Sequence, residues 1–269
     1  MKVVTWNVNS LKARKEYVEA FLDAEKPDIL AIQELKLETD KVPKEISTSR
    51  GYHLAIHGQK QWNGVLIASK SEITDIHTGL PDGDEGQSRL VAGTIEGIRF
   101  VNLYCPQGSE ETSPKYAYKL KFFDALIAWL DANHSKEEPV MLLGDINIGP
   151  RPCDVYWDTQ EQPKVVSHHP DELQRFKRLI SWGLTDLGQT LQEEGDFTFF
   201  DYRSFWDYRR RKYRYDLGLR IDLFLASDPL LERAKSISVL RPWRHKKKGM
   251  KPSDHVPVVL ELMPHPAPT

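Results

Sequence analysis

Residues 140–147 have the sequence Val140-Met141-Leu142-Leu143-Gly144-Asp145-Ile146-Asn147. The first four side chains are apolar, and so short a run that ends at a glycine is typical of a strand buried on both faces. A carboxylate and an amide follow at once, at the end of that rigid backbone. The stretch therefore predicts a buried sheet that delivers polar side chains to one of its ends.

The same pattern of an apolar strand followed by a polar side chain recurs along the chain. One predicted strand, Lys2–Asn7, ends in a polar residue, and Ile29–Gln33 is followed by another. A single Asp or Asn after a strand is most often a turn former or helix cap. Six such places in one chain, rich in oxygen ligands and poor in thiols, favour a shared site instead. Their polar residues are Asn7, Glu34, Tyr104, Asp145 with Asn147, Asp222, and Asp254 with His255.

The remaining pattern predicts an α/β fold. Short apolar segments indicate strands at 53–57, 64–69, 90–95, 99–104, 221–225 and 256–262, and helical spacing of apolar residues indicates helices at 16–24, 114–133 and 173–182. Glu96-Gly97 joins two of these strands closely enough for a hairpin. We expect two β-sheets packed face to face and flanked by helices. No low-complexity linker interrupts the chain, so we expect one domain over residues 1–263 and a frayed tail over 264–269.

Charge is distributed very unevenly along the chain. The formal net charge is −2, but the segment from Arg203 to Lys251 holds fifteen Lys/Arg against five Asp/Glu, a surplus of +10 that leaves −12 for the rest. Clustered charge forms a positive face even when the total is near zero. The small net negative charge therefore does not exclude a nucleic-acid partner.

Composition excludes several other classes of protein. No stretch approaches the run of about 18 apolar residues that a membrane span needs, and no signal peptide precedes Lys2-Val3-Val4, so we expect a cytoplasmic protein that acts without a membrane. Cys105 and Cys153 are too few for a disulfide framework and lack the neighbours of a zinc site. We expect a monomer.

Five stretches resemble, in this order, the motifs of the exonuclease III family of abasic-site endonucleases, and the resemblance runs from Met1 to about Leu262. The wider superfamily of metal-dependent endonucleases, exonucleases and phosphatases shares the Glu, Asp-x-Asn and Ser-Asp-His elements, whereas the first and fourth stretches favour the DNA-repair branch. The stretches are Thr5-Trp6-Asn7-Val8-Asn9, Ile32-Gln33-Glu34, Gly144-Asp145-Ile146-Asn147, Leu219-Arg220-Ile221-Asp222 and Pro252-Ser253-Asp254-His255.

The resemblance implies a four-layer α/β sandwich and a magnesium-dependent nuclease of DNA repair. Its substrate would be double-stranded DNA with abasic sites or blocked 3′ ends. The implied activities are AP endonuclease, 3′-phosphatase, 3′-phosphodiesterase and 3′-to-5′ exonuclease, as in base excision repair. The balance among them does not follow from the sequence.

Roles for the polar residues follow from their chemistry and from the resemblance. Because the surrounding ligands are oxygens, Glu34 is the best candidate to bind a hard cation, Mg²⁺ or Mn²⁺. The resemblance implies that Asp145 deprotonates the attacking water and that Asn147 donates its amide to the phosphate. Tyr104 either donates to the phosphate or protonates the leaving group. The candidate metal ligands as a set are Asn7, Glu34, Asp145, Asn147, Asp254 and His255.

His255 and Asp222 resemble the imidazole–carboxylate pair of the family. A neighbouring carboxylate favours the charged imidazolium, which can bind a phosphate oxygen. The alternative is a buried histidine that is satisfied by a local acceptor.

Two basic runs interleave cations with aromatic rings, in Trp206–Tyr215 and in Arg241–Lys248. Cations engage phosphates and rings stack on exposed bases, so we expect these runs, above all Arg209, Arg210, Arg211 and Lys212, to hold DNA without reading its sequence. Phe199, Leu219 and Ile221 occupy positions that in the family line a pocket for a flipped abasic sugar. Ordinary core packing is the alternative for these three.

His168 departs from the family pattern, because relatives usually carry an aromatic or apolar residue before the proline Pro170. We expect this histidine beside the pocket to favour frayed 3′ ends over internal abasic sites, unless it is an exposed loop residue. Three rival functions remain: a lipid or inositol phosphoesterase of the same superfamily, a non-catalytic DNA-binding paralogue, and an RNA-directed nuclease. The first would carry a hydrophobic loop that we do not find, and the second would have lost ligands that are present here.

Overall fold

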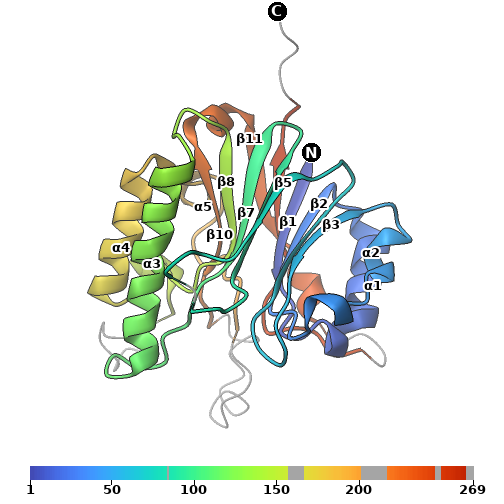
Figure 1. Cartoon of the computed structure of the whole chain (residues 1–269), viewed down its shortest axis with the longest axis horizontal. Coiled ribbons are helices and arrows are strands. Elements are labelled where there is room, and N and C mark those ends of the chain that lie inside the picture. Colours follow the sequence, from blue (N-terminus) through green and yellow to red (C-terminus); the bar gives the residue numbers. More distant parts are fainter. Residues whose placement is uncertain (84, 157–166, 201–216, 246–249, 265–269) are drawn as a thin grey trace, which may run out of the picture.

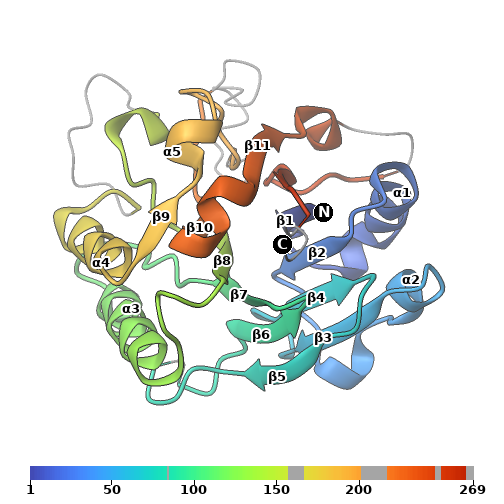
Figure 2. The ribbon, with the colours of Figure 1, turned by 90° about the horizontal axis from the view of Figure 1, so that it is seen from above.

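The computed structural model describes residues 1–83, 85–156, 167–200, 217–245 and 250–264. Two six-stranded sheets pack face to face, with strand orders β11-β12-β1-β2-β4-β3 and β5-β6-β7-β8-β10-β9 (Figures 1 and 2). The first sheet contains β1 (Lys2–Asn7), β2 (Ile29–Gln33), β3 (His53–His57), β4 (Val65–Ser69), β11 (Ala234–Val239) and β12 (Val258–Leu262). The second contains β5 (Thr74–Thr78), β6 (Leu90–Ile95), β7 (Ile98–Tyr104), β8 (Val140–Asp145), β9 (Leu184–Asp186) and β10 (Asp222–Ser227).

Helices cover the outer face of each sheet and complete four layers (Figure 1). Helices α3 (Pro114–Asn133) and α4 (Pro170–Ser181) pack on the second sheet, and α1 (Lys15–Glu25) and α2 (Glu45–Thr48) on the first. A short helix, α5 (Gly188–Leu191), follows β9. The predicted α/β sandwich of two packed sheets with flanking helices is thus confirmed.

Three apolar layers hold this arrangement together. The layer between the sheets joins Val3 and Ile67 of one sheet to Phe100 and Met141 of the other, all fully buried. The two outer layers lie under the helices, where Phe122 and Leu126 of α3 are fully buried. Burial of each large apolar side chain contributes about 1.5–3 kcal/mol, which makes these layers the main source of stability.

Local sequence accounts for the principal boundaries. Ser113 caps α3 by accepting from the backbone N–H of Lys115, and Pro114 occupies the first helical position. Glu96 and Gly97 both have positive φ, 48° and 77°, so the β6–β7 hairpin turns as a two-residue loop of type I′ permits. The predicted hairpin is confirmed.

Three strands were missed by the sequence prediction: β5, β9 and β11. Each lies at an edge of its sheet, where only one neighbour supplies hydrogen bonds and one side of the strand meets solvent. Four of the five residues of β5 are exposed, and β11 carries a register shift between Ala234 and Ser236. Such strands lack the apolar runs that identify the central ones.

Strand directions bring the polar strand ends to one end of the sandwich, the lower end in Figure 1. β1 runs parallel to β2 and β7 parallel to β8, while β10 and β12 run antiparallel to their neighbours and begin where the others finish.

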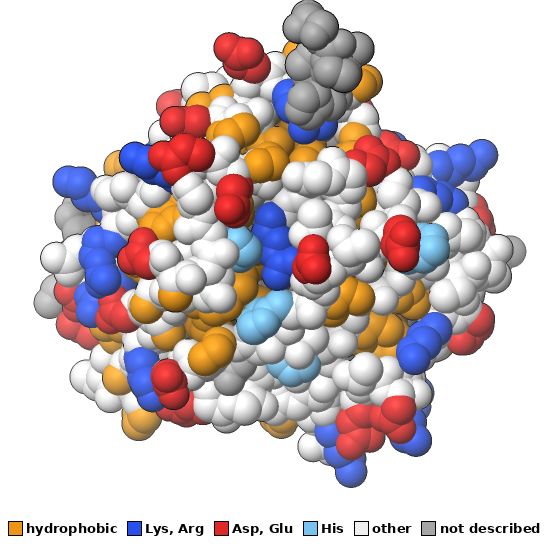
Figure 3. Space-filling model, turned by 45° about the horizontal axis from the view of Figure 1, so that its top comes forward, with side chains coloured by type: hydrophobic (Ala, Val, Ile, Leu, Met, Phe, Trp, Pro, Cys, Tyr) orange, Lys and Arg blue, Asp and Glu red, His pale blue; other side chains and the backbone are white. Residues whose placement is uncertain are grey.

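Figure 3 brings the upper end forward, and there acidic and basic side chains are interspersed without a continuous area of one sign among the described residues. Every helix in the described ranges is too short or too polar to serve as a membrane span.

Candidate functional site

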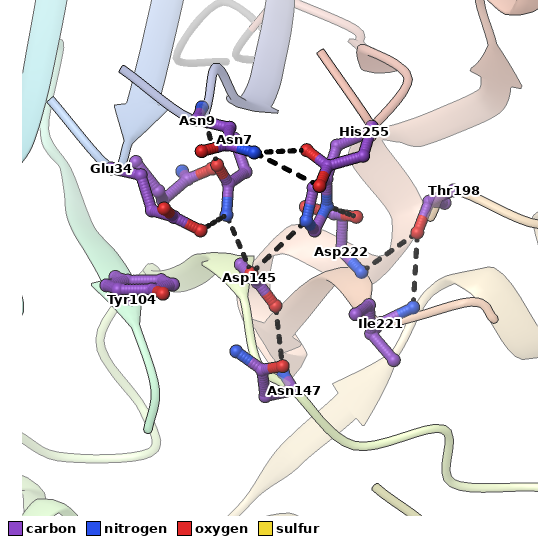
Figure 4. Close-up of polar contacts among 12 residues, drawn as sticks. Asn7, Asn9, Glu34, Tyr104, Asp145, Asn147, Thr198, Ile221, Asp222 and His255 are labelled. Carbon is purple, nitrogen blue, oxygen red and sulfur yellow. Dashed lines mark hydrogen bonds and ion pairs between the residues drawn. The ribbon is translucent and has the colours of Figure 1, made fainter. Parts of the chain in front are cut away.

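The six polar strand ends converge on one cluster (Figure 4). Asp145 pairs in register with Tyr104 on one side and with Asp222 on the other, which places three strand ends of the second sheet side by side. In the first sheet Asn7 pairs with Gln33, so that Glu34 follows directly beside it. The predicted site residues from both sheets therefore lie together.

Asn7 joins the two sheets at this cluster. Its side-chain amide donates to Glu34 Oε1 and to Asp145 Oδ2, both at 2.9 Å, and the residue is fully buried. Its own carbonyl oxygen Oδ1 accepts from the backbone N–H of Asn9 at 2.9 Å. One amide thus fixes two carboxylates that belong to different sheets.

His255 and Asp222 form a buried ion pair, with 2.8 Å between Nδ1 and Oδ2. The second ring nitrogen, Nε2, lies 3.7 Å from Asp145 Oδ2. Burial lowers the pKa of His255, but Asp222 and Asp145 outweigh it and raise the pKa to about 10. The ring is therefore an imidazolium at neutral pH, with both nitrogens protonated.

The two carboxylates bridged by Asn7 differ in acidity. Burial raises the pKa of Asp145 to about 7 against the opposing effects of His255 and of the Asn7 amide. Burial also raises the pKa of Glu34, but the Lys36 ammonium at 2.7 Å reverses this, so that the pKa is lowered overall. Glu34 is therefore a permanent anion, whereas Asp145 can take up and release a proton near neutral pH.

Asp254 is held by Asn9, whose amide donates to both carboxylate oxygens at 2.9 and 3.1 Å. Asn9 has a φ of +47°, a conformation that Asn tolerates better than most residues. Its Oδ1 accepts from Lys36 at 2.6 Å. Lys36 thus bridges Asn9 and Glu34, a role that the sequence motifs did not indicate.

Asn147 and Tyr104 complete the cluster beneath Asp145. The backbone N–H of Asn147 donates to Asp145 Oδ1 at 3.1 Å, and its side-chain amide donates to the Cys105 carbonyl at 2.9 Å. Burial, reinforced by Glu34 and Asp145, raises the pKa of Tyr104 well above its usual range. Its hydroxyl therefore keeps its proton and remains a hydrogen-bond donor.

The cluster opens into a cavity of about 400 Å³. The predicted pocket residues Phe199, Leu219 and Ile221 line one side, and the Phe199 ring lies 4.7 Å from the His255 ring, centroid to centroid. Isolated bridges pair Phe199 with both Leu219 and His255. Sequence reasoning missed several other lining residues, namely Lys36, Trp62, Asn63, Gln107 and Ser167.

Buried polar contacts fix the segment that carries Leu219 and Asp222. Arg220 makes paired contacts of 2.6 to 3.1 Å with Asp154 and Asp186, and its side chain is 2% exposed. Thr198 Oγ1 accepts from the backbone N–H groups of Ile221 and Asp222. The Arg of the Leu219–Asp222 motif is thus structural and orients its neighbours toward the cavity.

The predicted DNA-contacting runs are described only in part. Arg209, Arg210, Arg211 and Lys212 fall outside the described residues, as do residues 246–249 and the tail from residue 265. Trp243 was expected in a DNA-contacting run, and this is wrong: the ring is buried against Tyr17 and Phe21, and its N–H donates to Glu25.

His168 is buried as well, with Nδ1 2.5 Å from the Gly149 carbonyl oxygen. The alternative of an exposed loop residue is therefore wrong. The cavity wall at this point is formed by the preceding residue, Ser167.

Comparison with known proteins identifies the family. A model of the Endonuclease/Exonuclease/phosphatase family matches residues 4–255. The chain belongs to this family. Exodeoxyribonuclease III of Haemophilus influenzae is 32% identical over 97% of this chain and 100% of its own length.

Solved structures of the family agree. An AP endonuclease from Archaeoglobus fulgidus has a TM-score of 0.88 and 34% identity, and covers 97% of this chain and 99% of its own. A single-residue variant of the 3′ phosphatase NExo from Neisseria, bound to a product DNA hairpin, has a TM-score of 0.86 and 39% identity over the same shares. The chain therefore lies in the exonuclease III and AP endonuclease branch, and the resemblance inferred from the motifs is confirmed.

The same cluster provides a candidate metal site of this family. Ligand atoms of Glu34, Asp145 and His255 all lie within 4.8 Å of one another. Because His255 is an imidazolium paired with Asp222, the donors free to bind a cation are oxygens. Such a set fits a hard divalent cation.

Proposed function

We propose that the protein is a metal-dependent DNA-repair phosphodiesterase that hydrolyses the backbone of duplex DNA at abasic sites and at blocked 3′ ends. The observation that carries the proposal is the Asn7 amide, which holds Glu34 and Asp145 together in one cavity, with Asp145 Oδ2 3.7 Å from Nε2 of the charged His255. A basic carboxylate beside a fixed cation suits attack of water on an anionic phosphodiester.

The proposed steps use the side chains in turn. Asp145, with a pKa of about 7, orients water and takes its proton. The His255 imidazolium, kept charged by Asp222, donates to a non-bridging phosphate oxygen as negative charge builds there. The side-chain amide N–H of Asn147 that does not bind the Cys105 carbonyl donates to the phosphate as well. The protonated Tyr104 donates to the phosphate or to the departing oxygen.

Mg²⁺ or Mn²⁺ is the cation that we propose for the site. Glu34 would hold it, with Asn7 and Asp254 from the same edge and with Asp145 and Asn147 from the other sheet. When bound, such a cation offsets phosphate charge and favours departure of the leaving oxygen. We assign His255 to the phosphate instead of to the cation, because an imidazolium has no lone pair to offer.

Abasic sugars would enter the apolar side of the cavity. Phe199, Leu219 and Ile221 offer carbon surface to a deoxyribose that lacks a base. The buried His168 follows Ser167, which lines the cavity, and we propose that it shifts preference toward 3′ ends. Comparing incision of an abasic duplex with removal of a 3′ phosphate, in wild type and His168→Gly, tests it: an unchanged ratio defeats this part.

One panel of substrates tests the main proposal. Duplexes with an abasic site, a 3′ phosphate or a recessed normal 3′ end, and an RNA duplex, are each incubated with Mg²⁺ and with chelator. We expect cleavage of the damaged DNA only when Mg²⁺ is present. Preferred cleavage of RNA, or of an inositol phosphate added as a separate arm, would instead favour a rival function.

A further inference from the structure

Another buried ion pair lies behind the cluster. Lys119 of α3 and Glu172 of α4 approach to 2.5 Å between Nζ and Oε1, and both side chains are completely buried. Removing two charges from water costs more than an apolar pair of the same volume would, so such a pair is poorly explained by stability alone. Its contacts with the cavity suggest a different purpose.

The Lys119 ammonium uses its donors on two cavity segments as well as on Glu172. Nζ donates to the Asn147 carbonyl oxygen at 2.8 Å and to the Gln107 carbonyl oxygen at 3.1 Å. Asn147 has a φ of +55°, in the left-handed region that Asn tolerates better than most residues. The ammonium therefore fixes the backbone carbonyl of a residue that we place in the proposed site.

Glu172 extends the connection to a third segment. Its Oε2 accepts from the backbone N–H groups of Ser167 and His169 at 2.8 and 2.9 Å, which also caps α4. Ser167, Gln107 and Asn147 all line the cavity. The two residues of this ion pair thus hydrogen-bond to three separate segments of the chain that line the cavity.

We propose that Lys119 and Glu172 are positioning residues, which hold Asn147 where its side chain meets the phosphate in the transition state. The proposal rests on the proposed function, since it assigns Asn147 to the reaction. It predicts that loss of the pair lowers kcat and leaves KM nearly unchanged, because the ground-state contacts of the DNA lie elsewhere.

The first test separates stability from positioning. Lys119→Met alone leaves a buried unpaired carboxylate and should lower the melting temperature, whereas Lys119→Met with Glu172→Gln removes both charges, keeps the helix cap and should recover it. We still expect kcat of the double variant to fall by about 10-fold or more, because small displacements of a reacting group are costly. A double variant that recovers both its melting temperature and its kcat overturns the proposal.

A coupling test asks whether the pair acts through Asn147. In an Asn147→Ala background the same double substitution should change kcat less than about 2-fold, since residues that act as a unit are not additive. A full multiplicative loss would contradict the proposal. If wild type itself cleaves no DNA, the proposed function fails, and that outcome is distinct from either result for the pair.

Glu172→Asp covers the case in which the double variant does not fold. It keeps the charges balanced but withdraws the carboxylate by one carbon, so that it no longer reaches Lys119 and the two N–H groups together. We expect a several-fold lower kcat and shifted NMR signals of the Asn147 and Ser167 amides. The matched control is Glu25→Asp, which withdraws the carboxylate from its ion pair with Lys2 at the opposite end of the sandwich and should leave kcat unchanged. Equal behaviour of the two variants, in kcat and in those NMR signals, would refute the proposal.

Discussion

Replacement of Asp222 by Asn tests the His255 assignment most sharply. The carboxylate lies 2.8 Å from Nδ1 and is the largest influence that raises the pKa of the buried ring to about 10. With the charge gone, the opposing effect of burial is offset only by Asp145 and Asp254, so the pKa of His255 falls and the neutral ring becomes more populated. The neutral ring keeps its Nδ1 proton for the Asn carbonyl, so Nε2 loses the proton that would bind the phosphate.

The size of the effect follows from that lost donor. A charge-assisted hydrogen bond contributes about 1.5–3 kcal/mol, and general acid–base groups contribute on the order of 10²-fold or more in rate. We therefore expect single-turnover incision of an abasic duplex at pH 7.5 with Mg²⁺ to slow by about 10²-fold, or about 2.7 kcal/mol of barrier. His255→Ala should lose a similar amount.

One further measurement and one control variant accompany the rates. NMR titration of the chelated protein should show the His255 pKa several units lower in Asp222→Asn than in wild type. Asp28→Asn is the matched control, because that carboxylate accepts from the Lys2 backbone at the far end of β1. An Asp222→Asn enzyme that remains folded and incises within about 3-fold of the wild-type rate would exclude the proposed role of a charged His255 in binding the phosphate.

Three further outcomes are expected. The raised pKa of His255 contributes stability that is fully present below its unfolded pKa of about 6.5 and is lost as pH rises through about 10. The melting temperature of the chelated protein should therefore decline over that pH range. A melting temperature that does not change with pH there would contradict this expectation. Arg220→Met leaves Asp186 buried without its cation and Asp154 with Arg151 alone, and should lower the free energy of unfolding by about 3–5 kcal/mol, measured by urea denaturation. A loss below about 1 kcal/mol would count against the buried network. Leu219→Ala widens the cavity and should reduce the preference for abasic sites over normal 3′ nucleotides by roughly 10-fold in competition assays; unaltered selectivity would remove Leu219 from the pocket.

The central strands and their polar ends could be predicted from the sequence because burial on both faces leaves a plain signal. Val140–Leu143 is apolar throughout, and Asp145 follows where the strand must end. Edge strands such as β5 and β11 gave no such signal, since solvent on one side permits polar residues throughout.

The residues of the cluster could be predicted from the sequence better than the contacts that hold them in place. The motifs indicated Asn7, Asp145 and His255, but sequence gives no sign that Asn7 bridges the sheets, because that contact spans 138 residues and depends on how the sheets pack. Lys119 lies in helix α3, and a lysine in a helix is ordinarily expected to face solvent, yet its side chain is completely buried. A buried cation is recognised only when its partner, here Glu172, is seen in space.

Cation dependence on a damaged duplex tests whether the cluster acts with a bound divalent cation. Wild-type protein and Glu34→Gln are incubated with a duplex that carries one abasic site, with Mg²⁺ in one arm and chelator in the other. We expect rapid incision by wild type with Mg²⁺, and loss of about 10²-fold or more both in chelator and in Glu34→Gln. Incision by wild type at the same rate in chelator would contradict it.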